Sequence, residues 1–126
     1  MGLTNISATI TNLDDRRKQA SGEFLVDTGA GYTVIPYSMV KKLNLKPTKK
    51  QIFSLADGTT VTRNMGYALI KVDFTNQKAG VQEAPSAVVL GQPNDSALLG
   101  VITLENMGLI VDPFKRELRP MKLMLA

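Results

Sequence analysis

One acidic residue, Asp27, stands between two apolar stretches within residues 23–36 (EFLVDTGAGYTVIP). Residues 24–26 precede it and residues 32–35 follow it, and both stretches are typical of short buried strands. A carboxylate at the edge of a core is costly unless another group satisfies it or a reaction uses it. Asp27 is therefore the first candidate for acid–base chemistry.

The composition narrows that chemistry, because the sequence contains no cysteine and no histidine. Ser-His and Cys-His nucleophile systems are excluded, and so are disulfides and the commonest zinc ligand. Any acid–base catalysis must come from Asp, Glu, Lys or Tyr side chains. We expect no cofactor and no metal site.

The length of 126 residues predicts a single domain, 1–126, and the hydrophobic content of 44% is typical of a globular protein. The net charge is +4, with short basic clusters at 16–18, 41–42 and 49–50. These clusters are scattered, so we interpret them as solvated surface and expect no nucleic-acid partner. The sequence shows no signal peptide and no apolar run long enough for a membrane span. We expect no membrane partner and, by default, a cytoplasmic location.

The hydrophobic pattern predicts many short strands with one or two short helices, and hence a small, mostly β barrel or sandwich. Asp57-Gly58 lies between two β-type runs and indicates a hairpin, because both residues tolerate positive φ. The strands are expected over residues 3–12, 19–26, 33–35, 51–56, 59–65, 66–74, 85–90 and 109–111, and the helices over 36–43 and 101–107.

A second motif, Leu98-Leu99-Gly100, places two large apolar residues and a glycine directly before the second expected helix. Along the chain, the elements follow in the order apolar strand, Asp27-Thr28-Gly29-Ala30, hairpin, Leu98-Leu99-Gly100, short helix and last strand. In this order the chain resembles the retropepsin-like aspartic proteases, the single-domain kind found in retroviruses and, in a close variant, as small microbial proteins. The resemblance covers roughly residues 3–113. The tail, 114–126, is expected to extend an interface or to be partly loose.

The resemblance implies a retropepsin-like closed β-barrel that forms half of a homodimeric aspartic protease. Such enzymes activate a water molecule with two carboxylates that share one proton. One carboxylate acts as the base on the water, and its partner supplies a proton to the scissile carbonyl. Because the sequence has one Asp-Thr-Gly motif, a complete site requires Asp27 from each of two copies.

The same resemblance implies roles for the neighbouring residues. Thr28 is expected to hydrogen-bond across the dimer axis. Gly29, which lacks a Cβ, lets the backbone approach the carboxylates and the substrate. Ala30 completes the supporting loop, and Leu98, Leu99 and Gly100 are expected to pack behind it, with part of that segment lining a pocket.

The hairpin over about residues 53–62 is expected to act as a flap over the substrate, with Ala56, Asp57, Gly58 and Thr59 at its tip. An extended peptide or protein substrate would lie as an added strand, with alternate side chains in pockets. Apolar pockets predict cleavage between bulky apolar residues.

Two positions depart from the retroviral pattern. Those relatives usually carry Asp two residues after the motif glycine and Arg directly after the second glycine, and the two pair. Here the positions are Gly31 and Val101. Since both partners are replaced together, no orphaned charge remains. How the dimer interface is supported and how the substrate backbone is held are left open.

Other interpretations of these residues stay open at this point. Gly29-Ala30-Gly31 resembles a dinucleotide-binding loop, but Val34 stands where its third glycine would be. Asp27 could also serve a purely structural turn. The chain could be a catalytically silent dimeric β module that binds extended peptides. It could also be a basic barrel that binds nucleic acid, although its seven aromatic residues are scattered.

Overall fold

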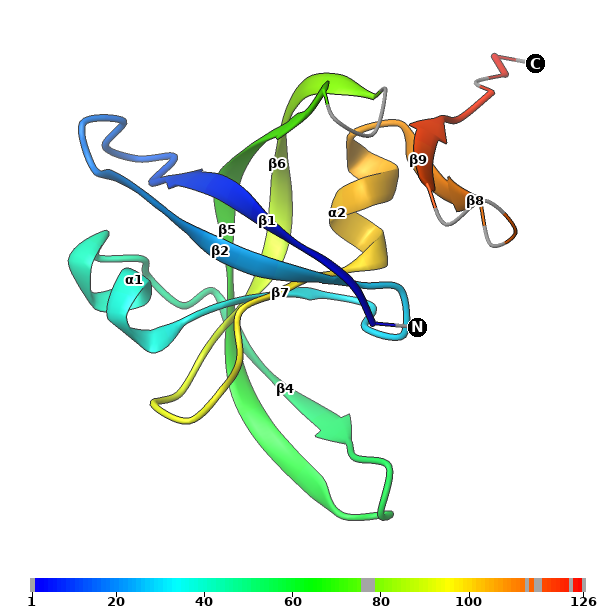
Figure 1. The fold of residues 1–126 in the computed structure, drawn as a ribbon. Coiled ribbons are helices and arrows are strands. Elements are labelled where there is room, and N and C mark those ends of the chain that lie inside the picture. Colours follow the sequence, from blue (N-terminus) through cyan, green and yellow to red (C-terminus); the bar gives the residue numbers. More distant parts are fainter. Residues whose placement is uncertain (1, 76–78, 113, 115–116, 123, 126) are drawn as a thin grey trace.

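The computed structural model describes residues 2–75, 79–112, 114, 117–122, 124 and 125. Within this part of the chain, six strands close into a barrel (Figure 1). The predicted mostly β fold with a closed barrel and short helices is confirmed. Around the barrel, the strands are β1 (Gly2–Thr11), β2 (Gln19–Asp27), β7 (Leu98–Leu99), β3 (Thr33–Ile35), β6 (Gly80–Leu90) and β5 (Thr60–Phe74), and β5 pairs with β1 to close the ring.

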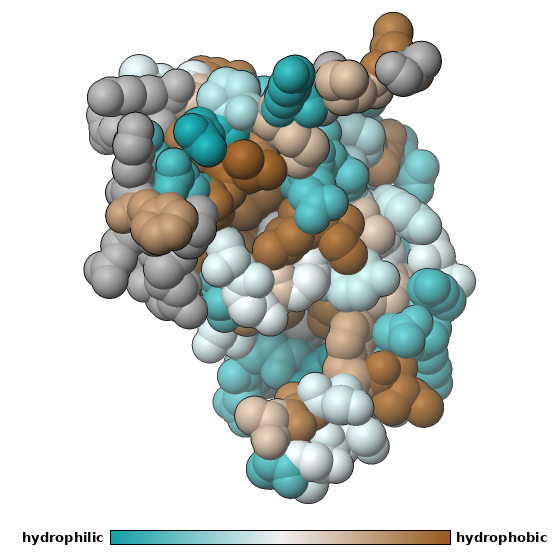
Figure 2. Space-filling view, turned by 90° about the vertical axis from the view of Figure 1, so that its right-hand side faces the viewer, coloured by the Kyte–Doolittle hydropathy of each residue, from teal (hydrophilic) through white to brown (hydrophobic). Residues whose placement is uncertain are grey.

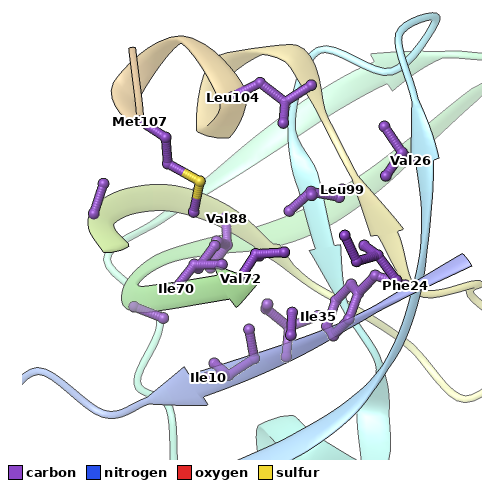
Figure 3. Close-up of a cluster of buried hydrophobic side chains, with 14 of the residues drawn as sticks. Ile10, Phe24, Val26, Ile35, Ile70, Val72, Val88, Leu99, Leu104 and Met107 are labelled. Atoms are coloured by element: carbon purple, nitrogen blue, oxygen red, sulfur yellow. The ribbon is translucent and has the colours of Figure 1, made fainter. Parts of the chain in front are cut away.

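Alternating side chains of these strands fill the barrel, because residues i and i+2 of a strand face the same side. In β5, every second residue from Ala68 to Phe74 is at most 1% exposed. Figure 3 shows how side chains from different strands meet in this core. Each fully buried large side chain contributes roughly 2 kcal/mol to folding. The largest of them include Ile10, Phe24, Ile35, Ile70, Val72, Phe74, Val88 and Leu99.

A long hairpin projects beyond the barrel, at the bottom of Figure 1. β4 (Lys49–Ser54) pairs with the first part of β5, from Thr60 to Met65. In the turn, the Gly58 N–H donates to the Leu55 carbonyl at 3.0 Å, and Gly58 has a φ of 87°. Asp57 contributes through its side chain, which accepts hydrogen bonds from the Thr59 N–H and hydroxyl, and the Thr59 hydroxyl lowers the pKa of Asp57. The hairpin lies where the Asp-Gly signal predicts it.

The strand expected over 85–90 begins earlier, at Gly80, so that prediction of its start was wrong. The prediction rested on the apolar run over residues 87–90, which suits a buried strand. Pro85 lies opposite Leu69 of β5 and is exposed, while β3 pairs farther along β6, at residues 88–90. No β3 residue therefore lies opposite Pro85.

Two short helices connect the strands. α1 (Tyr37–Lys42) follows Pro36 and buries Met39, and the chain leaves it through Asn44, which has a φ of 52°. α2 (Val101–Asn106) lies against β6 and buries Thr103 and Leu104. No helix in the described ranges is long and apolar enough to cross a membrane.

A small second sheet follows α2. β8 (Leu109–Asp112) pairs in antiparallel fashion with β9 (Glu117–Pro120), and both lie beside α2 in Figure 1. The predicted tail 114–126 thus contains a strand that the sequence pattern did not indicate. Residues 113, 115, 116, 123 and 126 of this region, and 76–78 of the expected loop 75–80, lie outside the described residues.

Candidate active site

Asp27 is the last residue of β2, and its carboxylate is held by its own loop. Oδ1 accepts a hydrogen bond from the Gly29 N–H at 2.9 Å. The Asp27 carbonyl oxygen accepts one from the Ala30 N–H at 3.1 Å. Such a side-chain bond to the backbone two residues on is a common turn device of aspartate. The side chain is half-buried, so the loop orients the carboxylate while leaving it open to solvent.

The strand β7 runs behind this loop, between the strands that enter and leave it. Leu98 and Leu99 lie parallel to β2, and Leu98 is also opposite Val34 of the antiparallel β3. Leu99 is fully buried in the barrel, whereas Leu98 is half-buried. The two motifs singled out from the sequence are therefore direct neighbours in space.

Gly100 brings two stretches of backbone into close contact. A Cβ at this position would lie 2.5 Å from the Tyr32 carbonyl carbon and 2.8 Å from the Gly31 oxygen. The Gly100 N–H donates to the Thr33 hydroxyl at 3.0 Å. Only glycine allows the backbone to pass this close to the loop.

The start of α2 supports the loop through its backbone. The Val101 N–H donates to the Ala30 carbonyl and the Ile102 N–H to the Gly31 carbonyl, both at 2.9 Å. The first N–H groups of a helix lack acceptors within the helix, and the loop supplies them. These hydrogen bonds involve Gly31 and Val101, the positions at which retroviral relatives carry an ion pair.

A pocket of about 580 Å³ opens between the Asp27 loop and the β4–β5 hairpin. Two of its lining residues, Tyr32 and Phe53, meet edge to face, with ring centroids 6.0 Å apart. Figure 2 shows this side of the molecule, where apolar residues gather in the middle of the face and on the hairpin below. The lining residues are Gly29, Ala30, Gly31, Tyr32, Val34, Phe53, Ser54, Leu55, Val61, Arg63, Val89, Asp95, Ser96 and Leu98.

A family model described as aspartyl protease matches residues 7–102, which is more than half of the chain. The chain belongs to the aspartyl protease family. The match includes the Asp27 loop, the hairpin and Leu98-Leu99-Gly100, and it ends before β8. The predicted resemblance to retropepsin-like enzymes is thereby confirmed. No curated protein sequence and no solved structure matches the chain significantly.

The residues with which the hairpin lines the cleft had not been singled out from the sequence. Ala56, Asp57, Gly58 and Thr59 form the exposed tip of the hairpin and are not among the residues that line the pocket. The hairpin instead lines it with Phe53, Ser54, Leu55, Val61 and Arg63. Phe53 lies opposite Val61, and Gln51 opposite Arg63, so the two-residue alternation of the hairpin could have identified this face.

A buried chain of hydrogen-bonded hydroxyl groups was also not predicted from the sequence. The Thr103 hydroxyl lies 2.6 Å from that of Thr33 and 2.9 Å from that of Ser86, and all three residues are at most 2% exposed. The Thr33 hydroxyl also accepts a hydrogen bond from the Gly100 N–H. Buried polar groups are costly unless they are hydrogen-bonded, so these residues satisfy one another while fixing Gly100.

One ion pair joins the hairpin to the loop that precedes β7. Arg63 donates through Nε and Nη2 to both carboxylate oxygens of Asp95, at 2.7 and 2.9 Å. The hydrogen bonds to Arg63 lower the pKa of Asp95, and those to Asp95 raise the pKa of Arg63. Among the described residues, no group of three His, Cys, Asp or Glu side chains could hold a metal ion.

Gly100→Ala is expected to destabilise the fold by about 2 kcal/mol or more, because the new methyl group would collide with backbone atoms of Tyr32 and Gly31. Urea unfolding measures this free energy. Gly31→Ala is the matched control, since a Cβ there meets nothing within 4 Å, and its effect should stay within about 0.5 kcal/mol. Equal effects of the two substitutions would contradict the close approach at Gly100.

Asp95→Asn is expected to cost about 1 kcal/mol of unfolding free energy at neutral pH, because it breaks the partly exposed pair with Arg63. A carboxyl whose folded pKa is depressed stabilises the fold above its unfolded pKa of about 3.9. That contribution disappears as pH falls through the lowered folded pKa. Urea unfolding of both proteins from neutral to strongly acidic pH measures the difference. When both proteins also carry Arg63→Gln, the difference in their unfolding free energies should depend little on pH. If the pH dependence persists, it comes from another group.

Proposed function

We propose that the protein is an aspartic endopeptidase that hydrolyses peptide bonds between apolar residues, with the whole chain, 1–126, acting as one domain. The observation that carries this proposal is the placement of Asp27. Its half-buried carboxylate lies on a loop that is fixed from behind by Gly100 and α2. The same loop borders a largely apolar cleft beneath a hairpin, in a chain of the aspartyl protease family.

The proposed site is completed by a second copy of the chain. Among the residues that line the pocket beside the Asp27 loop, Asp95 is the one that carries a carboxylate, and both of its oxygens are engaged by Arg63. Asp95 is therefore not available to share a proton with Asp27. A homodimer that brings two Asp27 side chains together on a two-fold axis supplies the missing carboxylate.

In such a dimer the two carboxylates share one proton, since like charges at close range cannot both ionise easily. The ionised member takes a proton from a water molecule, which attacks the scissile carbonyl carbon. The protonated member gives its proton to the carbonyl oxygen. The lack of a side chain at Gly29 leaves space for substrate beside the carboxylate. A Cβ at this position would lie only 3.2 Å from Asp27 Oδ1. No metal or cofactor is required for this step.

The surroundings of Thr28 support a subunit contact beside the loop. Thr28 is half-buried and borders a second, smaller pocket of about 250 Å³. Apolar side chains of α2 and β8, among them Val101, Leu104 and Leu109, line this pocket. We assign Thr28 the hydrogen bond across the axis, and the β8–β9 sheet a place next to the interface.

The substrate is an extended peptide that lies between the loop and the hairpin. A strand-like peptide would place alternate side chains in the cleft, where Val34, Val61 and Leu98 offer apolar contacts. The hairpin tip, Ala56 to Thr59, would close over it and exclude water. These contacts favour bulky apolar side chains on both sides of the scissile bond.

Asp27→Asn is expected to abolish cleavage, with a loss of at least about a thousandfold, because asparagine keeps the shape but cannot share the proton. Wild type and variant are incubated with a mixed peptide library from acidic to neutral pH, and the cut sites are read by mass spectrometry. Cleavage by both proteins would place the activity elsewhere. If a folded, dimeric wild type cleaves none of the peptides, the alternative is favoured, a dimeric β module that binds peptides without cutting them.

A further inference from the structure

Two of the residues that line the cleft carry a charge, Arg63 and Asp95. They come from distant parts of the chain, the second strand of the hairpin and the loop before β7. Their side chains are only 22% and 23% exposed. A fork of two hydrogen bonds joins them, so this part of the cleft wall holds one positive and one negative charge side by side.

The hydrogen-bonding capacity of the two partners is unequal. Asp95 Oδ1 accepts from Arg63, and Oδ2 accepts from both Arg63 and the Gln92 N–H. Arg63 also donates through Nη1 to the Thr62 carbonyl. Three of the five guanidinium N–H groups thus have acceptors in the described part of the chain. The guanidinium therefore keeps donors for a ligand, whereas the carboxylate is engaged on both oxygens.

This pairing determines which side chains the wall can accept. A charged substrate side chain would meet both signs at similar distances, so attraction to one partner is offset by repulsion from the other. The cost of removing that charge from water would remain. An uncharged carbonyl oxygen can accept the remaining N–H groups at a much smaller cost of desolvation.

We propose that Arg63 and Asp95 together form one substrate subsite, which selects an uncharged hydrogen-bond acceptor such as a glutamine or asparagine side chain. Asp95 is the element that rejects acidic side chains, because it balances the charge of Arg63. This assignment rests on the proposed peptidase function, since it names the specificity of the same cleft.

Single and double substitutions test the subsite. Asp95→Asn keeps an oxygen for the Gln92 N–H but leaves the guanidinium unbalanced, and should shift the preference toward glutamate. Arg63→Gln leaves the carboxylate unbalanced and should shift it toward lysine. The double variant should prefer uncharged side chains again. At one and the same peptide position, each single variant should change the charged-to-glutamine ratio of kcat/KM by at least about tenfold.

The probes are eight-residue peptides with Leu-Phe at the centre and Gln, Glu or Lys at each flanking position in turn. Asp15→Asn is the matched control, because it breaks an exposed Asp15–Arg17 pair that lies outside the cleft, and it should leave all preferences unchanged. Thermal unfolding verifies that each variant is folded. The same peptides are also titrated against proteins that carry Asp27→Asn, with binding read by fluorescence anisotropy.

The two arms separate the subsite from the peptidase function. If Asp95→Asn shifts the binding preference toward glutamate and Arg63→Gln shifts it toward lysine, but wild type cleaves no peptide, the subsite is supported and the peptidase function is overturned. Cleavage or binding by folded variants with wild-type preferences at every position would overturn the subsite alone. If folded wild type neither binds nor cuts any of the peptides, both proposals are overturned.

Discussion

The close approach of two backbone segments at Gly100 is the constraint on which the rest of the site depends. Because position 100 has no Cβ, the backbone there lies against Tyr32 and Gly31. This contact brings the first N–H groups of α2 within reach of the loop carbonyls. Backbone hydrogen bonds from the start of α2 thus help to fix the Asp27 loop at the positions where retroviral relatives usually carry an ion pair. A loop held in this way can present a carboxylate in one orientation, which acid–base catalysis requires.

The barrel and the cleft are built by the same strands. β5 contributes Ile70 and Val72 to the core at one end and Val61 and Arg63 to the cleft at the other. The same two-residue alternation therefore fills the barrel and lines the cleft. The ion pair of Arg63 with Asp95 connects this strand to the loop before β7.

Local patterns in the sequence predicted a mostly β barrel or sandwich, the hairpin at Asp57-Gly58 and both helices, because each of these follows from periodicity or turn chemistry within a few residues. The closure of the barrel and the packing of Leu98-Leu99-Gly100 behind the Asp27 loop were expected from the resemblance to retropepsin-like proteases. The hydroxyl chain of Thr33 and Thr103 and the Arg63–Asp95 pair could not be predicted in this way. Their partners lie 70 and 32 residues apart, so only the folded topology brings them together. The turn residues of the hairpin led to the prediction that its tip contacts substrate. The cleft is instead lined by residues of the hairpin beside the tip.

The most direct test of this account is a subunit-mixing experiment. Wild-type and Asp27→Asn chains are unfolded together, refolded in varied proportions at constant total concentration, and assayed on a peptide that wild type cleaves. If each site needs Asp27 from both copies, activity follows the square of the wild-type fraction, so that equal amounts leave about a quarter of it. An activity that falls in simple proportion to the wild-type fraction would show that one chain carries a complete site, and it would contradict the shared pair of carboxylates.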